Sequence, residues 1–276
     1  MSIELVTELC RDHLDSQALA NLNNMREKCG QGGWAYLEVH FASLPRKLGR
    51  GFIDVPQDQI TSGIRLGSLR TCDLGAASLL LEIESAGTEA RLFDLYAQGD
   101  ALERCMILKA LSFLPHDDNT IRLLQEAHRT NDEELFRAAF ADTDLPSQVL
   151  SDDDYYRGVL KSAFMDIEYA RLLDAPSRAT SELSDMLLEF RSEREAAGRK
   201  PWPGSLELAA HAPSPAVPGC LAGDIRHGDD QRRFHAVRGA GLLIAKGHDF
   251  LREQLTIQQP KERNAQIKTE IERILA

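Results

Sequence analysis

The sequence predicts an all-α protein made of stacked helical hairpins, that is, a HEAT-like or irregular α-solenoid. Apolar residues recur at steps of three to four along most of the 276 residues, which is the period of a helical face. Aromatic residues make up only 6%, so Leu and Ala, which favour helix, must fill most of the core. No segment shows the period-two alternation of a strand, and the best candidate, residues 52–55, is too short to matter.

The first third of the chain is predicted to form helices separated by glycine and proline. Asp15 or Ser16 is placed to cap the second helical piece, because both side chains accept hydrogen bonds from free backbone amides. The glycine-rich run at residues 29–33 is expected to end that helix, and Pro45 to kink or end the next one. Asp73 is expected to cap a strongly apolar helix. The predicted helices of this third span residues 3–28, 34–48 and 57–69, and another follows residue 73.

Two turns far apart in the sequence resemble each other. GDALERCMILKAL, which begins at Gly99, aligns with GDDQRRFHAVRGA, which begins at Gly228, and Gly, Asp and one Arg (Arg104, Arg233) coincide. The Asp is predicted to cap the following helix, and the Arg to cover the loop or pair with that Asp. Helix-turn-helix units of this kind stack into α-solenoids. The alternative, that any two capped helices look alike, stays open.

The remaining helices are predicted from caps and acidic starts. Asp118 or Asn119 is expected to cap one helix and Asn131 or Asp132 the next. Acids at residues 152–154 suit the positive end of a helix dipole. Residues 200–203 and 212–219 are rich in proline and are predicted to be loops, and Pro146 is expected in a connector. The predicted helices span residues 88–97, 102–114, 121–128, 134–140, 155–165, 177–197, 206–211 and 261–275.

Charge and cysteine usage restrict the partners and the compartment. The formal net charge of −11 argues against a nucleic-acid partner and against docking on an anionic membrane surface. The five cysteines form no Cys-x-x-Cys pair, which is typical of a reducing cytosol. The N-terminus lacks the basic start of a signal peptide, and no stretch approaches the roughly 18 apolar residues that cross a bilayer. We therefore expect a cytoplasmic protein without membrane insertion.

No sequence motif indicates catalysis or a cofactor. A phosphate-binding loop, a dinucleotide fingerprint, a zinc-protease helix and a nucleophile elbow are all absent from the sequence. The eight histidines form no pair at metal-ligand spacing on one helix, and the acid clusters at residues 152–154 and 229–230 are explained as helix starts. Cys72 and Cys105 are interpreted as small core residues. We therefore predict no catalytic residue, no metal ligand and no cofactor.

One segment is a candidate for ligand binding. The predicted helix 34–48 combines Trp34, Tyr36 and His40 with a basic end that includes Arg46 and Arg50. A crowded, kinked helix ending in cations is suited to form the wall and mouth of a pocket for an anion. The alternative is a core helix with a solvated basic end.

Seven blocks of the sequence resemble the EboA family. They keep their order across residues 34–246 and read FASLPRKLGR, RTCDLGAASLLLEI, LFDLYAQGDALERCMILKALSFLP, ELFRAAFADTDLP, DDDYYRGVLKSAFM, LLEFRSEREAAGRKPW and DDQRRFHAVRGAGLL. We expect one helical domain over residues 1–276, with N-terminal helices (1–33) and C-terminal helices (247–276) flanking this EboA-like region.

The resemblance implies a place in secondary metabolism. EboA-like proteins are encoded in a gene cluster that makes or moves a small metabolite precursor. The other proteins of the cluster resemble a prenyltransferase, a sugar-isomerase-like barrel, a cyclase and a metal-dependent hydrolase. No catalytic residue of the family can be carried over to this chain.

Two functions from different classes remain. The first is a non-enzymatic helical scaffold or small-metabolite-binding protein that serves this precursor pathway, with other proteins of the pathway and a small polar metabolite as expected partners. The alternative is an enzyme of unrecognised type that acts on a small polar or anionic metabolite, with its site near Trp34, Tyr36, His40, Arg46 and Arg50. A nucleic-acid binder is disfavoured by the net charge.

Overall fold

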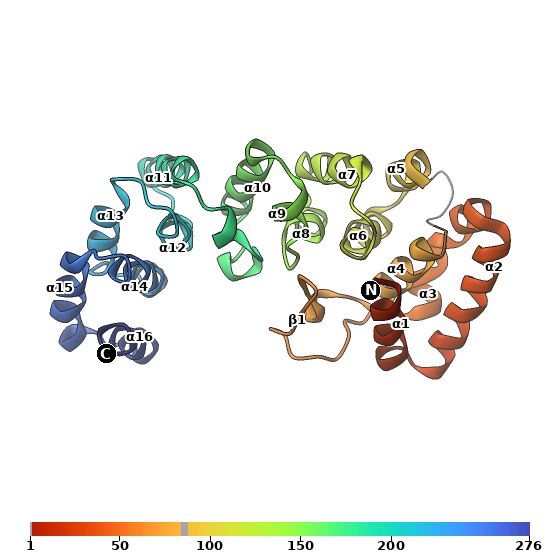
Figure 1. Cartoon of the computed structure of the whole chain (residues 1–276), viewed down its shortest axis with the longest axis horizontal. Helices are drawn as coiled ribbons and strands as arrows, with labels where there is room; N and C mark the ends of the chain where they lie inside the picture. The colour runs from red at the N-terminus through yellow and green to blue at the C-terminus, as the bar shows by residue number, and fades with distance from the viewer. Residues whose placement is uncertain (1, 84–87) are drawn as a thin grey trace. The chain divides into compact units, whose positions relative to one another are not determined.

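The computed structural model describes residues 2–83 and 88–276, and these residues are mostly helical (Figure 1). The chain divides into two compact units. Unit 1 comprises Met1–Tyr155 with Arg171–Leu173, and unit 2 comprises Tyr156–Ala170 with Asp174–Ala276. The prediction of a mostly helical chain is confirmed. Within the described ranges, no helix is both long enough and apolar enough to cross a membrane.

Unit 1 is built around α4, a helix that is buried on almost every side. It packs against α1, α2, α3 and α6, and residues 72–81 are all buried. Burial of the Leu and Ala side chains in this stretch contributes to the core of the unit. The helices of unit 1 are α1 (Ser2–His13), α2 (Ser16–His40), α3 (Leu44–Leu48), α4 (Thr71–Ile83), α5 (Thr88–Gln98), α6 (Ala101–Ala110), α7 (Asp118–His128), α8 (Glu133–Phe140) and α9 (Leu145–Val149).

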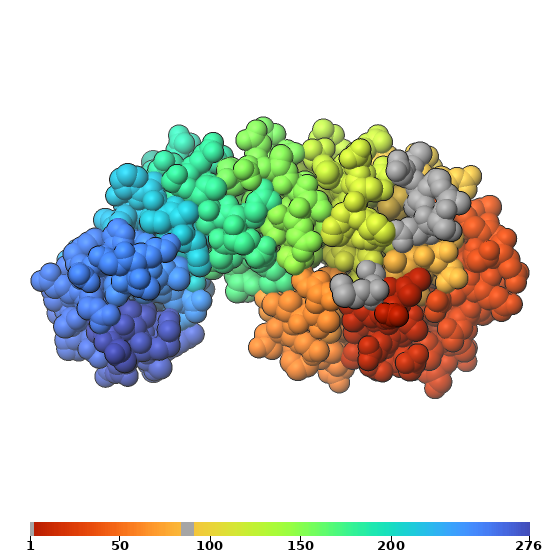
Figure 2. All heavy atoms as spheres, viewed as in Figure 1, coloured from red at the N-terminus to blue at the C-terminus, as the bar shows by residue number. Residues whose placement is uncertain are grey.

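Alternate helices of unit 1 pack against one another. One row contains α4, α6 and α8, in which each helix contacts the next, and a second row contains α5, α7 and α9 (Figure 1). Consecutive helices such as α7 and α8 also pack together, so each apolar face is covered by a neighbour. In the space-filling view, side chains fill the space between neighbouring helices of the unit (Figure 2).

The predicted break at residues 29–33 and the predicted helix over residues 34–48 are confirmed in part. Helix α2 continues to His40 with a break at Gly33, where the backbone angles (φ 54°, ψ −140°) are open mainly to glycine. A short 3-10 turn, Phe41–Ser43, follows, and α3 then begins. Pro45 lies in the first turn of α3, where a missing backbone N–H costs nothing, so this proline starts a helix and does not end one.

Residues 57–69 form a small hairpin and not the predicted helix. Strands β1 (Ile60–Thr61) and β2 (Ile64–Arg65) pair antiparallel. The two residues between them, Ser62 and Gly63, both have positive φ, as a two-residue hairpin turn with matching twist requires. The weak helical pattern of these residues does not produce a helix, because this turn and a β-bridge between Ile64 and Thr143 stabilise the extended backbone.

Several predicted caps are confirmed. The side chains of Asp15, Asp100, Asp132 and Asp229 accept from free backbone amides at the starts of α2, α6, α8 and α14. Asp100 forms a complete capping box, because the Glu103 carboxylate also accepts from the Asp100 amide at 2.8 Å.

Other caps differ from the prediction by one to three residues. Asp117, and not Asp118 or Asn119, caps α7. Thr180 caps α11, and Ser177 lies outside that helix. Asp73 lies in the first turn of α4, where its carboxylate accepts from the Arg70 amide at 2.7 Å. In each case several adjacent polar side chains suit a cap, and the backbone path decides which one is used.

Unit 2 is also helical, with α12, α14 and α16 packed in succession and α13 and α15 beside them. Pro218 lies in the first turn of α13, so the prediction of a loop over residues 212–219 is wrong at its end. The predicted last helix is shorter than expected, since α16 begins only at Ala265. The helices are α10 (Asp152–Phe164), which contains the boundary between the units, α11 (Ser181–Ala196), α12 (Ser205–Ala209), α13 (Val217–Asp224), α14 (Asp230–Ile244), α15 (Asp249–Gln258) and α16 (Ala265–Leu275).

In both similar turns the arginine covers the loop, as predicted. Arg104 donates to the carbonyl oxygens of Tyr96 (3.1 Å) and Ala97 (2.9 Å) at the end of α5. Arg233 donates to the carbonyl oxygens of His227 (2.9 Å) and Gly228 (3.1 Å). These bonds give carbonyls at the end of a helix or in a turn an additional donor, and the Tyr96 carbonyl oxygen also accepts from the Gly99 amide at 3.3 Å.

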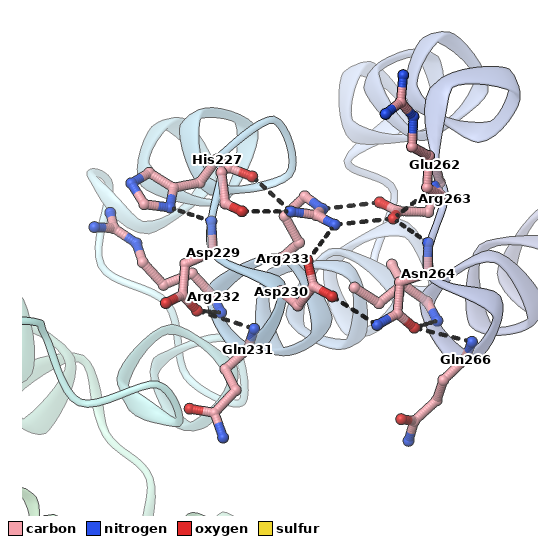
Figure 3. A network of polar contacts seen from close by, with 12 residues as sticks. His227, Asp229, Asp230, Gln231, Arg232, Arg233, Glu262, Arg263, Asn264 and Gln266 are labelled. Carbon is pink, nitrogen blue, oxygen red and sulfur yellow. Dashed lines mark hydrogen bonds and ion pairs between the residues drawn. The ribbon is translucent and has the colours of Figure 1, made fainter.

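The second turn has an additional carboxylate. Figure 3 shows Arg233 between the turn and Glu262, whose carboxylate accepts from it at 2.8 and 2.9 Å. The side chain of Glu262 is 1% exposed and also accepts from the backbone amides of Arg263 and Asn264. The hydrogen bond from Arg233 lowers the pKa of Glu262 to about 2, although burial opposes this shift.

Candidate functional site

Unit 1 contains a pocket of about 570 Å³ between residues 52–70 and helices α6 and α8. We call it the basic pocket, because the cations Arg70, Lys109, Arg137 and Arg171 line it. Arg70 immediately precedes α4, Lys109 lies on α6 and Arg137 lies on α8. The packing of α4, α6 and α8 in one row therefore brings cations from distant parts of the sequence to one surface.

An exposed aromatic ring lies at this pocket. Phe52 is 59% exposed, and the Arg70 guanidinium and the Lys109 ammonium lie 5.3 and 5.7 Å from its ring centroid. Both distances are within the range of a cation–π interaction. Lys109 is also fixed by Asp73 (3.0 Å) and by the carbonyl oxygen of Ser68 (2.5 Å). The ring therefore offers an apolar surface beside positive charge.

The floor of the basic pocket is a buried carboxylate. Asp142 is 4% exposed, and its two oxygens pair with Arg65 (2.9 Å) and with Arg171. Its amide donates to the carbonyl oxygen of Arg171 at 2.7 Å. Removing a buried carboxylate from two cations is costly, so this group is held in place and is not available for exchange.

Two other ion pairs of the pocket are of a different kind. Arg70 pairs with Glu134, and Arg137 pairs with Glu133 at 2.9 Å, and the acidic side chains are 63% and 58% exposed. Exposed pairs contribute little free energy, so an anion from solution can replace either acid. Burial acts to lower the pKa of Arg70, but the hydrogen bond and charge of Glu134 outweigh it and raise the pKa, which keeps Arg70 cationic. Guanidinium groups bind carboxylate or phosphate in a bidentate manner.

The residues that the sequence analysis selected lie elsewhere in unit 1. Trp34 is buried, and the rings of Tyr36 and His40 lie 4.2 Å apart, tilted by 41°. Arg46 and Arg50 are exposed. None of these five residues lines the basic pocket, as far as the described residues define it. Ligand binding by them stays a prediction.

Sequence analysis missed the basic pocket, although a signal was present. Spacing does not connect Arg70, Lys109 and Arg137, because they lie on separate helices or ahead of one. The block ELFRAAFADTDLP, however, contains Glu134, Arg137 and several other lining residues. The blocks that begin RTCDLG and LFDLYA contain Arg70 and Lys109. The resemblance could therefore have pointed to these side chains.

The cysteines of unit 1 are core residues. Cys72 and Cys105 are buried, as expected, and burial raises the pKa of their thiols to about 11 and about 12. Such thiols are protonated at neutral pH and are poor nucleophiles. Across residues 2–83 and 88–276, no group of three His, Cys, Asp or Glu side chains is arranged to hold a metal ion.

Comparison with known proteins identifies the family. No curated protein and no solved structure matches the chain. The family model described as "Metabolite traffic protein EboA" matches residues 2–206. The match includes the helices before residue 34, which the resemblance had left out, and ends before the block DDQRRFHAVRGAGLL. Every residue that lines the basic pocket falls within it. Because the match covers well over half of the 276 residues, the chain belongs to the EboA family.

Proposed function

We propose that this chain is a non-enzymatic helical protein that binds a small anionic metabolite in its basic pocket and serves the traffic of a secondary-metabolite precursor. The description of the family as metabolite traffic proteins supports the cellular role. The position of the whole basic pocket within the matched residues supports the assignment of binding to that pocket.

The proposed architecture is an irregular, HEAT-like stack of helical hairpins. The succession of α4, α6 and α8 in unit 1, and of α12, α14 and α16 in unit 2, supports this interpretation. In such stacks each hairpin contacts mainly its neighbours and leaves its remaining surface open to ligands or partners. A binding protein or scaffold needs only this surface and no catalytic group.

The proposal of an anionic ligand rests on one observation: Arg70 and Arg137 are paired with exposed acids that an anion can replace. A ligand carboxylate or phosphate takes the places of Glu133 and Glu134, and the two acids turn to solvent. Phe52 then contacts an apolar part of the ligand. The cavity volume of about 570 Å³ lies within the roughly 300–1,000 Å³ that is usual for small-molecule sites.

Calorimetric titration with citrate and with inorganic phosphate tests the proposal. We expect the double variant Arg70→Ala/Arg137→Ala to bind citrate at least about tenfold more weakly than the unmodified chain, because two charge-assisted hydrogen-bonding groups are lost. The matched control is Arg129→Ala, which removes a guanidinium that is paired with Glu126 and does not line the pocket. Equal citrate affinity in the unmodified chain and the double variant would refute the binding site.

The scaffold part of the proposal concerns other proteins of the same pathway. We propose that they bind this chain in the cytoplasm, on the basis of the resemblance and of the unpaired, mostly buried cysteines. Affinity purification from the native host, followed by mass spectrometry, is expected to recover at least one of them. Recovery of none, together with no citrate binding, would contradict the proposal. Turnover of a bound metabolite would instead support the enzyme of unrecognised type.

A further inference from the structure

Unit 2 contains a second pocket, of about 850 Å³, with a different lining. We call it the aromatic pocket, because Tyr169, Trp202 and Phe234 line it together with His235. Tyr169 begins the 3-10 turn Tyr169–Arg171, Trp202 lies in the connection between α11 and α12, and Phe234 and His235 lie on α14. The family match covers the lining residues up to Gly204 but not those on α14, which lies beyond residue 206.

The rings form a corner. Tyr169 meets Trp202 edge to face, with centroids 6.1 Å apart and planes at 83°, and meets His235 at 6.3 Å and 75°. Trp202 is fixed by the hydrogen bond from its Nε1 to the carbonyl oxygen of Ile167, at 2.7 Å. Trp202 is 2% exposed, so it supports Tyr169 and offers no free face. A flat apolar ring can stack on Tyr169 and meet the edge of His235, whose plane is at 75° to that of Tyr169.

The corner carries a fixed hydrogen-bonding group. Glu207 is 3% exposed, and its carboxylate lies 2.6 Å from Nδ1 of His235 and accepts from Arg238 at 2.7 Å. A carboxylate at Nδ1 assigns the proton to that nitrogen, which leaves Nε2 of the neutral ring as an acceptor. Among the described residues, no hydrogen-bond partner of Nε2 is found. Nε2 is therefore the polar group that this pocket offers to a ligand.

The charges around the aromatic pocket are already compensated. Arg194 pairs with Asp166 at 3.0 Å, Lys200 pairs with Asp229 at 2.9 Å, and Arg232 pairs with the buried Asp224 at 2.6 Å. Arg194 also donates a hydrogen bond to the carbonyl oxygen of Lys200 at 2.6 Å, which fixes the backbone at this edge of the pocket. Two of these pairs are exposed, as in the basic pocket. Here, however, acids outnumber cations, so the pocket favours a neutral ligand over an anion. The lining acids are Asp166, Glu168, Asp229 and Asp230, and the lining cations are Arg194, Lys200 and Arg232.

We propose that the aromatic pocket binds a neutral hydroxylated aromatic ring, that is, a phenol. Its flat face lies against Tyr169, beside Phe234, and its hydroxyl donates to Nε2 of His235. This site goes beyond the proposed function, because it lies in the other unit and selects another ligand class. The ligand needs a hydroxyl next to a ring, so the corresponding methyl ether is a poor ligand.

Calorimetry and saturation-transfer NMR with p-cresol and 4-methylanisole test this on the unmodified chain. The two probes have similar shape, but only p-cresol can donate to Nε2. We expect p-cresol to bind about tenfold more tightly, which is the effect of one hydrogen bond. Citrate should not displace p-cresol, because the two ligands are proposed to bind in different pockets. The proposal for each pocket can therefore be refuted without refuting the other. Equal affinity for the two probes, or binding of neither, would overturn the proposal.

Variants then assign the contact to His235. His235→Phe keeps a ring and removes the acceptor, so p-cresol should lose its advantage over 4-methylanisole. Phe234→Leu should weaken the binding of both probes by the same factor. Phe250→Ala is the control, since Phe250 is an exposed aromatic residue outside the pocket. Circular dichroism checks the fold of each variant, and His235→Leu, which also removes the acceptor, replaces His235→Phe if that variant does not fold. An unchanged preference for p-cresol in the folded variant would refute the role of His235.

Discussion

The basic pocket of unit 1 and the aromatic pocket of unit 2 differ in how firmly their polar groups are held. In the basic pocket, Arg70 and Arg137 pair with acids that are exposed to solvent. In the aromatic pocket, the carboxylate of Glu207 is buried and fixes His235. Loosely paired cations can accept an anion, whereas a fixed imidazole selects a single neutral donor. Exposed ion pairs line both pockets, but cations outnumber acids by four to three in the basic pocket, and acids outnumber cations by four to three in the aromatic pocket. The ligand class therefore depends on this balance and on the polar group that is held in place.

Removing the buried carboxylate of Asp142 should have the largest effect on stability. Asp142→Ala leaves Arg65 and Arg171 without their shared buried carboxylate, and it places alanine at a φ of 62°. We expect the free energy of unfolding to fall by about 3 kcal/mol or more, as for a broken buried ion pair. Urea denaturation measures this. A loss below about 1 kcal/mol would show that Asp142 is as exchangeable as an exposed acid.

A buried carboxylate of unit 2, Glu262, makes stability depend on pH. The pKa of Glu262 is lowered from 4.5 to about 2, chiefly by the hydrogen bond from Arg233. Because the folded state favours the carboxylate, its contribution is fully present above pH 4.5 and is lost as the pH falls toward 2. Glu262→Gln should lower the free energy of unfolding by about 2 kcal/mol at pH 7, and the difference should shrink below pH 4.5.

Urea denaturation at several pH values measures this difference. Glu126→Gln is the matched control, because Glu126 belongs to an exposed pair with Arg129. A difference between the unmodified chain and Glu262→Gln that stays constant from pH 7 to pH 3 would contradict the account.

A substitution in the hairpin beside the basic pocket should have an intermediate effect on stability. Gly63 has a φ of 77°, and an added Cβ would lie 2.1 Å from the Asp144 carboxylate. We expect Gly63→Ala to lower the free energy of unfolding by about 1–2 kcal/mol, from backbone strain and this close contact. Gly219→Ala is the control, because nothing lies within 4 Å of a Cβ at that position. Equal thermal stability of the two variants would contradict the assigned turn.

The smallest effect on stability should come from an exchangeable acid. Glu134→Gln removes the exposed partner of Arg70, so the free energy of unfolding should change by less than about 0.5 kcal/mol. The same variant should bind citrate a few times more tightly, because a competitor for the guanidinium has been removed. Urea denaturation and calorimetry measure the two quantities on the same sample. Weaker citrate binding would show that Glu134 helps to form the pocket.

Features that depend on nearby residues were predictable from the sequence. Arg104 and Arg233 bind carbonyl groups within eight residues of their own position, and the caps Asp100 and Asp229 act within three residues. Local sequence determines such contacts, so the turns that begin at Gly99 and Gly228 could be described in advance.

Features that depend on distant residues were not predictable. The hairpin at residues 60–65 is stabilised by its bridge to Thr143, about 80 residues away, and its helical pattern was misleading. The cations of the basic pocket come from positions 70, 109, 137 and 171. The contact between Glu207 and His235 spans two helices of unit 2. The spacing of residues within one helix cannot predict contacts between residues on different helices.

Mass spectrometry of the intact protein under native conditions, after purification from its host, tests the central claim most directly. We predict that the unmodified chain carries a small compound with a carboxylate or phosphate group, and that Arg70→Ala/Arg137→Ala purified in parallel does not. A chain that carries no such compound and also fails to bind citrate, or a double variant that retains the compound in full, would contradict a metabolite-binding role for the basic pocket.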